Sequence, residues 1–371
     1  MYKKIFFILF LLLQTHFLSA KSLKLLMQPG VDTTDAQIKQ VVELWRNYLA
    51  SNPDSLYNNP YWSANEKKEY KAFDFLRVGY QGNAIYKGFT PLLLSVSPKA
   101  NGYYEIKTAF ISFNYQQELC VANVYAKKEN GSYKLFNSLP LKTKDWLKKT
   151  VGSITYHYSR DYKFNMSNAE RMNTFANSLQ KLYNLKPVKA NFYIGKNLDE
   201  LMKLDGLEFY MGMGNAFKSQ GITDQGNNII FSGGDGEYFP HEVVHIYLNP
   251  LFKNSNWILQ VGLAVYYGGS MGHPLEWHIK RMDKYLQLHP EINLDSIYSF
   301  RYMDNYTNPE AELGGFLCKL AFEKGGIKEL KTLLSFGPNE NDLYLAVEKV
   351  FGIKRDDFNA FIRRKLSEYS K

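Results

Sequence analysis

The chain has 371 residues, a formal net charge of +9 and two cysteines, and its length is sufficient for two domains. The mild basic excess contains no dense Lys/Arg cluster, which argues against a nucleic-acid-binding face and favours a solvated basic surface. Two cysteines exclude a fold built on disulfides, and we expect Cys120 and Cys318 to be separate buried thiols.

The first 20 residues have the pattern of a secretory signal peptide. Lys3 and Lys4 precede an unbroken apolar run over residues 5–13, and small residues stand just before Lys21. This run is too short to cross a bilayer, which requires about 20 residues, and no later stretch reaches that length. We therefore expect an exported protein, periplasmic or extracellular, without an integral membrane segment. The alternative interpretation of the run is a short membrane anchor.

Residues 32–145 have the pattern of a small α+β domain. Thr34 begins a capping-box pattern, and apolar residues at helical spacing follow from Ile38 to Leu49. Alternating apolar residues then predict an antiparallel sheet, with Asn130-Gly131 as a hairpin signal. A helix followed by such a sheet resembles the cone-shaped sheet of the nuclear-transport-factor-2-like group. The expected strands cover residues 91–96, 104–110, 119–126 and 133–136.

A second pattern covers residues 151–371. Short strands and helices alternate in its first part, with Ser167 and Asn197 at the expected helix starts, and the rest is mostly helical. The fold class predicted for the chain is therefore α+β: a helix-plus-antiparallel-sheet domain, then a domain whose C-terminal part is mostly helical. The strands expected in this second domain cover residues 154–158, 188–194 and 228–231.

The motif His241-Glu242-Val243-Val244-His245 opens a predicted short helix. Pro240 suits the first turn of that helix, and Asn249-Pro250 ends it. One helical turn separates the two imidazoles, so both can reach one ion. We predict His241 and His245 as zinc (Zn²⁺) ligands and Glu242 as the general base. The alternative is that both histidines are ordinary helix residues.

A second predicted helix, residues 257–269, follows the motif and ends at a glycine pair. With the HExxH helix it resembles the gluzincin metallopeptidases of the peptidase-MA-like group, in which this helix begins like W-[LI]-x-E-G-L-A-x-Y. The segments 313–321 and 351–361 resemble later helices of that group. The resemblance implies a gluzincin-like domain over 151–371 and a secreted zinc metallopeptidase that hydrolyses peptide or protein substrates.

The chain departs from that group at Val261, which stands where the family has its third zinc ligand, a glutamate. Valine cannot bind zinc, and Gln260 lies about 100° around the helix. Three hypotheses follow: an active peptidase with another third ligand, a catalytically defective binding or scaffolding module of the cell envelope that holds zinc weakly, or a domain without metal. The candidate replacement ligands are Asp235, Glu237, His273, Glu276 and His278.

The short strand predicted over residues 228–231 lies just before the motif helix. In the gluzincin resemblance, a strand in this place can pair with the extended backbone of a substrate. The alternative is a plain edge strand with no binding role.

Overall fold

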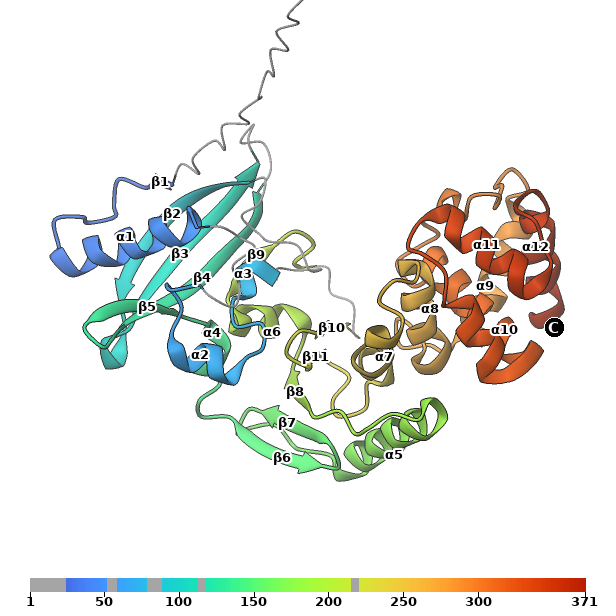
Figure 1. The fold of residues 1–371 in the computed structure, drawn as a ribbon, viewed down its shortest axis with the longest axis horizontal. Coiled ribbons are helices and arrows are strands. Elements are labelled where there is room, and N and C mark those ends of the chain that lie inside the picture. The colour runs from blue at the N-terminus through green and yellow to red at the C-terminus, as the bar shows by residue number, and fades with distance from the viewer. Residues whose placement is uncertain (1–24, 52–58, 79–88, 113–117, 215–219) are drawn as a thin grey trace, which may run out of the picture.

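The computed structural model describes residues 25–51, 59–78, 89–112, 118–214 and 220–371. The predicted signal peptide, residues 1–20, lies outside these described residues. The predicted fold class is confirmed: the chain is α+β, with two sheets in its first two-thirds and a helical C-terminal part (Figure 1).

The first sheet has the strand order β1-β2-β3-β4-β5, and β9 pairs with β4 at one end. Helix α1 packs on this sheet through Val41, Trp45 and Tyr48, whose side chains are buried. The predicted hairpin is confirmed, because Asn130 and Gly131 have positive φ angles of 52° and 84° in the turn between β4 and β5. The bounds are β1 Leu26–Met27, α1 Ala36–Leu49, α2 Ala64–Glu69, α3 Phe75–Val78, β2 Phe89–Pro98, β3 Tyr104–Ser112, β4 Glu118–Glu129, β5 Ser132–Phe136, α4 Ser138–Lys142 and β9 Leu207–Tyr210.

Helix α1 begins one residue later than the capping-box prediction. Asp35, not Thr34, is the N-cap, and its carboxylate accepts hydrogen bonds from the backbone N–H groups of Gln37 and Ile38 at 2.7 and 2.9 Å. A carboxylate accepts two donors at the positive end of a helix, which favours aspartate over the preceding threonine.

The second sheet has the strand order β10-β11-β8-β7-β6, with β10 as an antiparallel edge strand. Alternate residues of its strands face opposite ways. Phe192 and Ile230 join the core formed with the C-terminal helices, whereas Tyr193 and Phe231 join the core of the first sheet. This sheet therefore separates the two cores. The bounds are β6 Leu147–Val151, β7 Ile154–Tyr158, α5 Met166–Tyr183, β8 Ala190–Gly195, α6 Leu198–Asp205, β10 Gln220–Asp224 and β11 Ile229–Gly233.

Contacts cross the boundary expected near residues 145–151. Strand β9 lies far along the chain, yet it pairs with β4 of the first sheet, with Phe209 opposite Val121. The side-chain amide of Asn227, in the β10–β11 turn, bonds both the backbone N–H and the C=O of Ala72 at 2.8 Å. Strand β9 and the β10–β11 turn therefore contact the first sheet domain, although both follow the expected boundary.

The C-terminal helices pack together beside helix α7, which lies between them and the second sheet (Figure 1). Helices α8 and α10 approach closely because Gly262 of one faces Gly314 and Gly315 of the other. Within the described residues, no helix combines the length and the apolar character needed to cross a membrane. Cys120 and Cys318 are both buried and form no disulfide with one another, as predicted. The bounds are α7 Pro240–Leu248, α8 Trp257–Gly268, α9 Leu275–Leu288, α10 Pro309–Leu333, α11 Glu340–Phe351 and α12 Phe358–Tyr369.

Candidate active site

The HExxH motif lies on helix α7, as predicted. Pro240 occupies the first turn, where its missing N–H has no helical acceptor to lose, and the helix ends at Leu248. The end of α8 abuts the start of this helix: a Cβ placed on Gly268 would lie 2.4 Å from the backbone N of His241. Only a glycine permits this approach, and it brings the turn after α8 next to the first histidine.

The two imidazoles of the motif point at one another. Their Nε2 atoms are 3.3 Å apart. Nδ1 of His241 donates to the backbone C=O of Gly269 at 2.6 Å, and Nδ1 of His245 faces Oδ1 of Asn249 at 3.3 Å. Because both Nδ1 atoms are hydrogen-bonded to oxygen acceptors, the neutral rings present Nε2 lone pairs to the same point.

Burial keeps the second histidine uncharged. Burial, with a smaller contribution from the neighbouring His241, lowers the pKa of His245 to about 4, while Glu242 and Asn249 oppose the shift. A neutral imidazole is the form that binds a metal ion. His245 is therefore in its ligand form at neutral pH.

The spacing of the two Nε2 atoms fits a tetrahedral zinc ion. Zinc binds imidazole nitrogen at about 2.0–2.1 Å, so two such ligands lie about 3.3 Å apart, which is the separation seen between His241 and His245. Each ring also has its other nitrogen held by an oxygen, as in most metal-binding histidines. The donor atoms present thus match two of the protein ligands of a hydrolytic zinc site.

Glu242 lies between the two histidines in sequence and packs against the edge strand β10. Its Oε2 accepts a hydrogen bond from the hydroxyl of Thr223 at 2.6 Å, and the residue is 6% exposed. A Cβ on Gly221 would lie 2.7 Å from Cγ of Glu242, so the strand has a glycine where the carboxylate stem crosses it. The sequence alone did not indicate Thr223 or Gly221 as residues of the site, because neither belongs to a recognisable motif.

Among the residues that the structure describes, no third protein ligand is brought to the histidine pair. Val261 is partly buried and packs against the apolar core. In the part of the chain that the structure describes, no group of three or more His, Cys, Asp or Glu side chains is arranged to hold a metal ion.

The candidate replacement ligands have other partners. His278 is fully buried and uses both ring nitrogens in hydrogen bonds, and Glu276 pairs with Lys319 at 3.5 Å. The buried carboxylate of Glu237 accepts the backbone N–H of Asn165 at 2.6 Å. The remaining two are His273, which stacks on Trp277 with ring centroids 3.8 Å apart, and Asp235, which is half-buried and has an interaction of its own.

The strand expected to pair with a substrate is not at the sheet edge. β11, Ile229–Gly233, has β10 on one side and β8 on the other, so its backbone groups are already paired. The prediction was wrong because the sequence offers no strong strand signal over 220–224, which supplies the outer strand. The edge that faces the motif helix belongs to β10.

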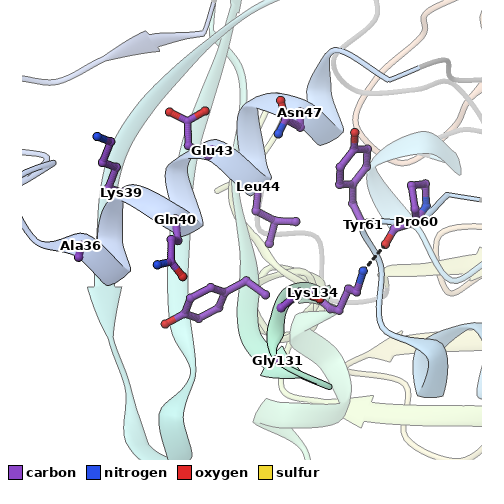
Figure 2. Close-up of a pocket in the computed structure, with 12 residues that line it drawn as sticks. Ala36, Lys39, Gln40, Glu43, Leu44, Asn47, Pro60, Tyr61, Gly131 and Lys134 are labelled. Carbon is purple, nitrogen blue, oxygen red and sulfur yellow. Dashed lines mark hydrogen bonds between the residues drawn. The ribbon is translucent and has the colours of Figure 1, made fainter.

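A separate groove lies on the first sheet domain (Figure 2). One face of α1, Pro60 and Tyr61, and the β4–β5 turn with the start of β5 line a groove of about 640 Å³. The Nζ of Lys134 donates to the backbone C=O of Pro60. The groove contains no residue of the HExxH motif. Its lining residues are Ala36, Lys39, Gln40, Glu43, Leu44, Asn47, Pro60, Tyr61, Gly131, Ser132, Tyr133 and Lys134.

Neither protein-family models nor curated proteins match the chain.

Proposed function

We propose that the chain is a zinc-dependent hydrolase of peptide bonds, with His241 and His245 as metal ligands and Glu242 as the general base. The observation that carries this proposal is the 3.3 Å separation of the two Nε2 atoms, with Nδ1 of each ring held by an oxygen. In the tautomers in which both Nδ1 atoms donate, the two Nε2 lone pairs face one another at this distance, and a bound cation accepts both.

Zinc, when bound, supplies a Lewis acid that polarises a carbonyl and makes a water molecule more acidic. Glu242 then takes the proton of the attacking water and returns it to the leaving amine. Thr223 holds Oε2 of this carboxylate, while Oε1 has no hydrogen bond within the described part of the chain. Oε1 is therefore the atom that we expect to carry the proton.

The position of strand β10 supports a peptide as the substrate. One side of β10 pairs with β11, and the strand is the edge of the described sheet. An extended peptide adds to such an edge through main-chain hydrogen bonds. Because Thr223 belongs to β10 and contacts Glu242, a peptide bound along this strand runs beside the proposed base.

A second candidate function is a peptide-binding module without catalysis. Val261 favours it, because an apolar side chain stands where the resemblance places a third ligand, and no third donor lies with the pair among the described residues. Two histidines hold zinc more weakly than three ligands do. The two candidates share the peptide-binding edge and differ in zinc occupancy and turnover.

The first test is the zinc content of the purified chain after equilibration with zinc and dialysis, measured by elemental analysis. We expect close to one zinc per chain in the wild type and none in His245→Ala. His289→Ala is the matched control, because that exposed histidine pairs with Glu291 on the surface and its loss should leave zinc bound. A wild type that takes up no zinc contradicts the proposal.

Turnover is then measured with a peptide library and mass spectrometry. We expect Glu242→Gln to keep zinc and to lose cleavage by about 10²–10⁴-fold, the usual contribution of a general base. Zinc binding without cleavage of any peptide would leave the second candidate function.

A further inference from the structure

The carbonyl that holds His241 belongs to a tight turn after α8. In the segment 269–273, Ser270 and His273 exchange backbone hydrogen bonds of 2.9 and 2.8 Å, and Met271 and Gly272 have φ angles of 48° and 76°. A Cβ on Gly269 would lie 2.4 Å from the backbone O of His273, and the φ of Gly269 is +75°. The turn therefore has one available shape, and this shape determines where the Gly269 carbonyl points.

His278 of helix α9 holds this turn from inside the protein. Its Nε2 lies 3.0 Å from the backbone O of Ser270, and because a carbonyl only accepts, Nε2 is the protonated nitrogen. Nδ1 of the neutral ring then accepts from the hydroxyl of Thr307 at 3.3 Å. That hydroxyl in turn accepts from Nε of Arg281 at 3.2 Å, so its one proton is directed at His278.

This chain of donors has a single direction. It runs from Arg281 to Thr307, from Thr307 to His278 and from His278 to the carbonyl of Ser270. His278 is 0% exposed and Thr307 is 2% exposed, so water does not compete for these bonds. A reversed tautomer of His278 leaves a lone pair facing the carbonyl oxygen, which is unfavourable in a buried site.

We propose that His278 is a positioning residue for the metal site, which holds the 269–273 turn so that the Gly269 carbonyl fixes the tautomer and orientation of His241. This inference rests on the proposed zinc site. The peptide between Gly269 and Ser270 connects the two contacts: the first carbonyl accepts from His241 at 2.6 Å, and the next accepts from His278 at 3.0 Å. His278 supports a ligand from behind and is not itself a ligand.

The simpler interpretation is that His278 only fills the core. Its surroundings are partly polar, because the fully buried carboxyl of Glu312 lies 3.7 Å from Nδ1. A ring that merely fills space is replaced well by an apolar side chain of similar volume. A ring that orients the turn is replaced only by a side chain with a donor at the position of Nε2.

The test compares His278→Gln with His278→Leu in the full chain. The glutamine amide places an N–H near the position of Nε2 and can bond Ser270, whereas leucine cannot. The first measurement is the zinc dissociation constant by competition with a chromophoric chelator. We expect His278→Leu to weaken zinc binding about 10–100-fold, the usual effect of losing the outer partner of a metal-binding histidine, and His278→Gln to stay within about threefold of the wild type.

The second measurement is the tautomer of His241 in the zinc-free protein, by ¹⁵N NMR of the imidazoles. We expect protonation at Nδ1 in the wild type and in His278→Gln, and a tautomer mixture in His278→Leu. Thr307→Val, which removes the hydroxyl with little change of shape, is the second variant if His278→Leu does not fold, and we expect it to shift both readouts in the same direction.

The outcomes separate the two proposals. If the wild type binds no zinc, the proposed function is wrong. The His241 tautomers measured by NMR in the wild type and the variants then decide whether His278 orients His241. If His278→Leu and Thr307→Val change neither the zinc affinity nor the His241 tautomer, the positioning role is overturned and the proposed zinc site is unaffected. Equal losses of affinity in the glutamine and leucine variants also overturn it, because they show that packing alone matters.

Discussion

Single residues decide what the HExxH helix can do. His241 and His245 present their Nε2 atoms 3.3 Å apart, and Thr223 holds one oxygen of Glu242. Against this, Val261 is an apolar side chain at the position of the expected third ligand. In the proposed zinc site, the histidine pair supplies two ligands and the carboxylate the base, and the valine supplies no third ligand.

The role of position 261 is tested by Val261→Glu. We expect the zinc affinity to rise at least about tenfold, which corresponds to about 1.4 kcal/mol, because a third protein ligand is added. The control is Gln260→Glu, which adds the same charge to the next position of α8, about 100° around the helix. The side-chain amide of Gln260 donates to the backbone O of Ser255. An equal gain in both variants would show a general effect of charge and contradict the assignment of position 261.

At the scale of elements, the site depends on three close approaches at glycines. Helix α8 meets α10 through Gly262 and Gly314, and its end meets the start of α7 at Gly268. Edge strand β10 meets α7 through Gly221. These glycines bring the helix, the strand and the turn that contacts His241 to one place, since any side chain there separates them.

The α8–α10 contact is tested by Gly262→Ala. A Cβ there would lie 2.2 Å from the backbone C of Gly314, and backbone on both sides cannot move aside. Alanine favours a helix by about 1 kcal/mol, but overpacking costs about 1–3 kcal/mol or more. We expect the free energy of unfolding in urea to fall by roughly 2 kcal/mol.

Gly30→Ala is the matched control for that comparison. No atom lies within 4 Å of a Cβ on Gly30 and its φ is not positive, so its stability should stay within about 0.5 kcal/mol of the wild type. If Gly262→Ala is as stable as this control, then α8 and α10 move apart without a loss in the free energy of unfolding, which contradicts the prediction.

At the scale of the whole molecule, two cores share the second sheet. Phe192 and Tyr193 are neighbours in β8, yet they belong to different cores. The Asn227–Ala72 contact joins the halves at the turn between β10 and β11, and the β9–β4 pairing joins them within the first sheet. The first sheet domain therefore contacts the hairpin whose edge strand packs against Glu242.

Both cores also contain a buried carboxyl group, which makes stability depend on pH. Burial raises the pKa of Glu66 to about 7 and that of Glu312 to about 8, from an ordinary value of 4.5. Between pH 4.5 and the raised pKa of each group, the folded chain binds more protons than the unfolded chain. The stability that each neutral carboxyl contributes is therefore present at low pH and is lost as the pH rises from about 4.5 to 8.

We expect the wild type to have a smaller free energy of unfolding at pH 8 than at pH 5. In Glu312→Gln the loss should be smaller by up to roughly 4 kcal/mol, since an amide does not ionise. Urea unfolding at the two pH values measures this. A wild type whose stability does not fall between pH 5 and 8, or a variant with the same fall, would contradict the buried neutral form of Glu312.

The sequence by itself determined the features that depend on residues a few positions apart. The spacing of His241 and His245, the Asn130-Gly131 hairpin and the α+β class follow from local periodicity and turn chemistry, because the backbone repeats within four residues. Only the tertiary structure decided which distant groups meet. Thr223 contacts Glu242 across 19 residues, Gly269 contacts His241 across 28, and Asn227 contacts Ala72 across 155. The order of the strands also depended on packing, since β10 and β9 have weak patterns of their own and are held by the strands and helices around them.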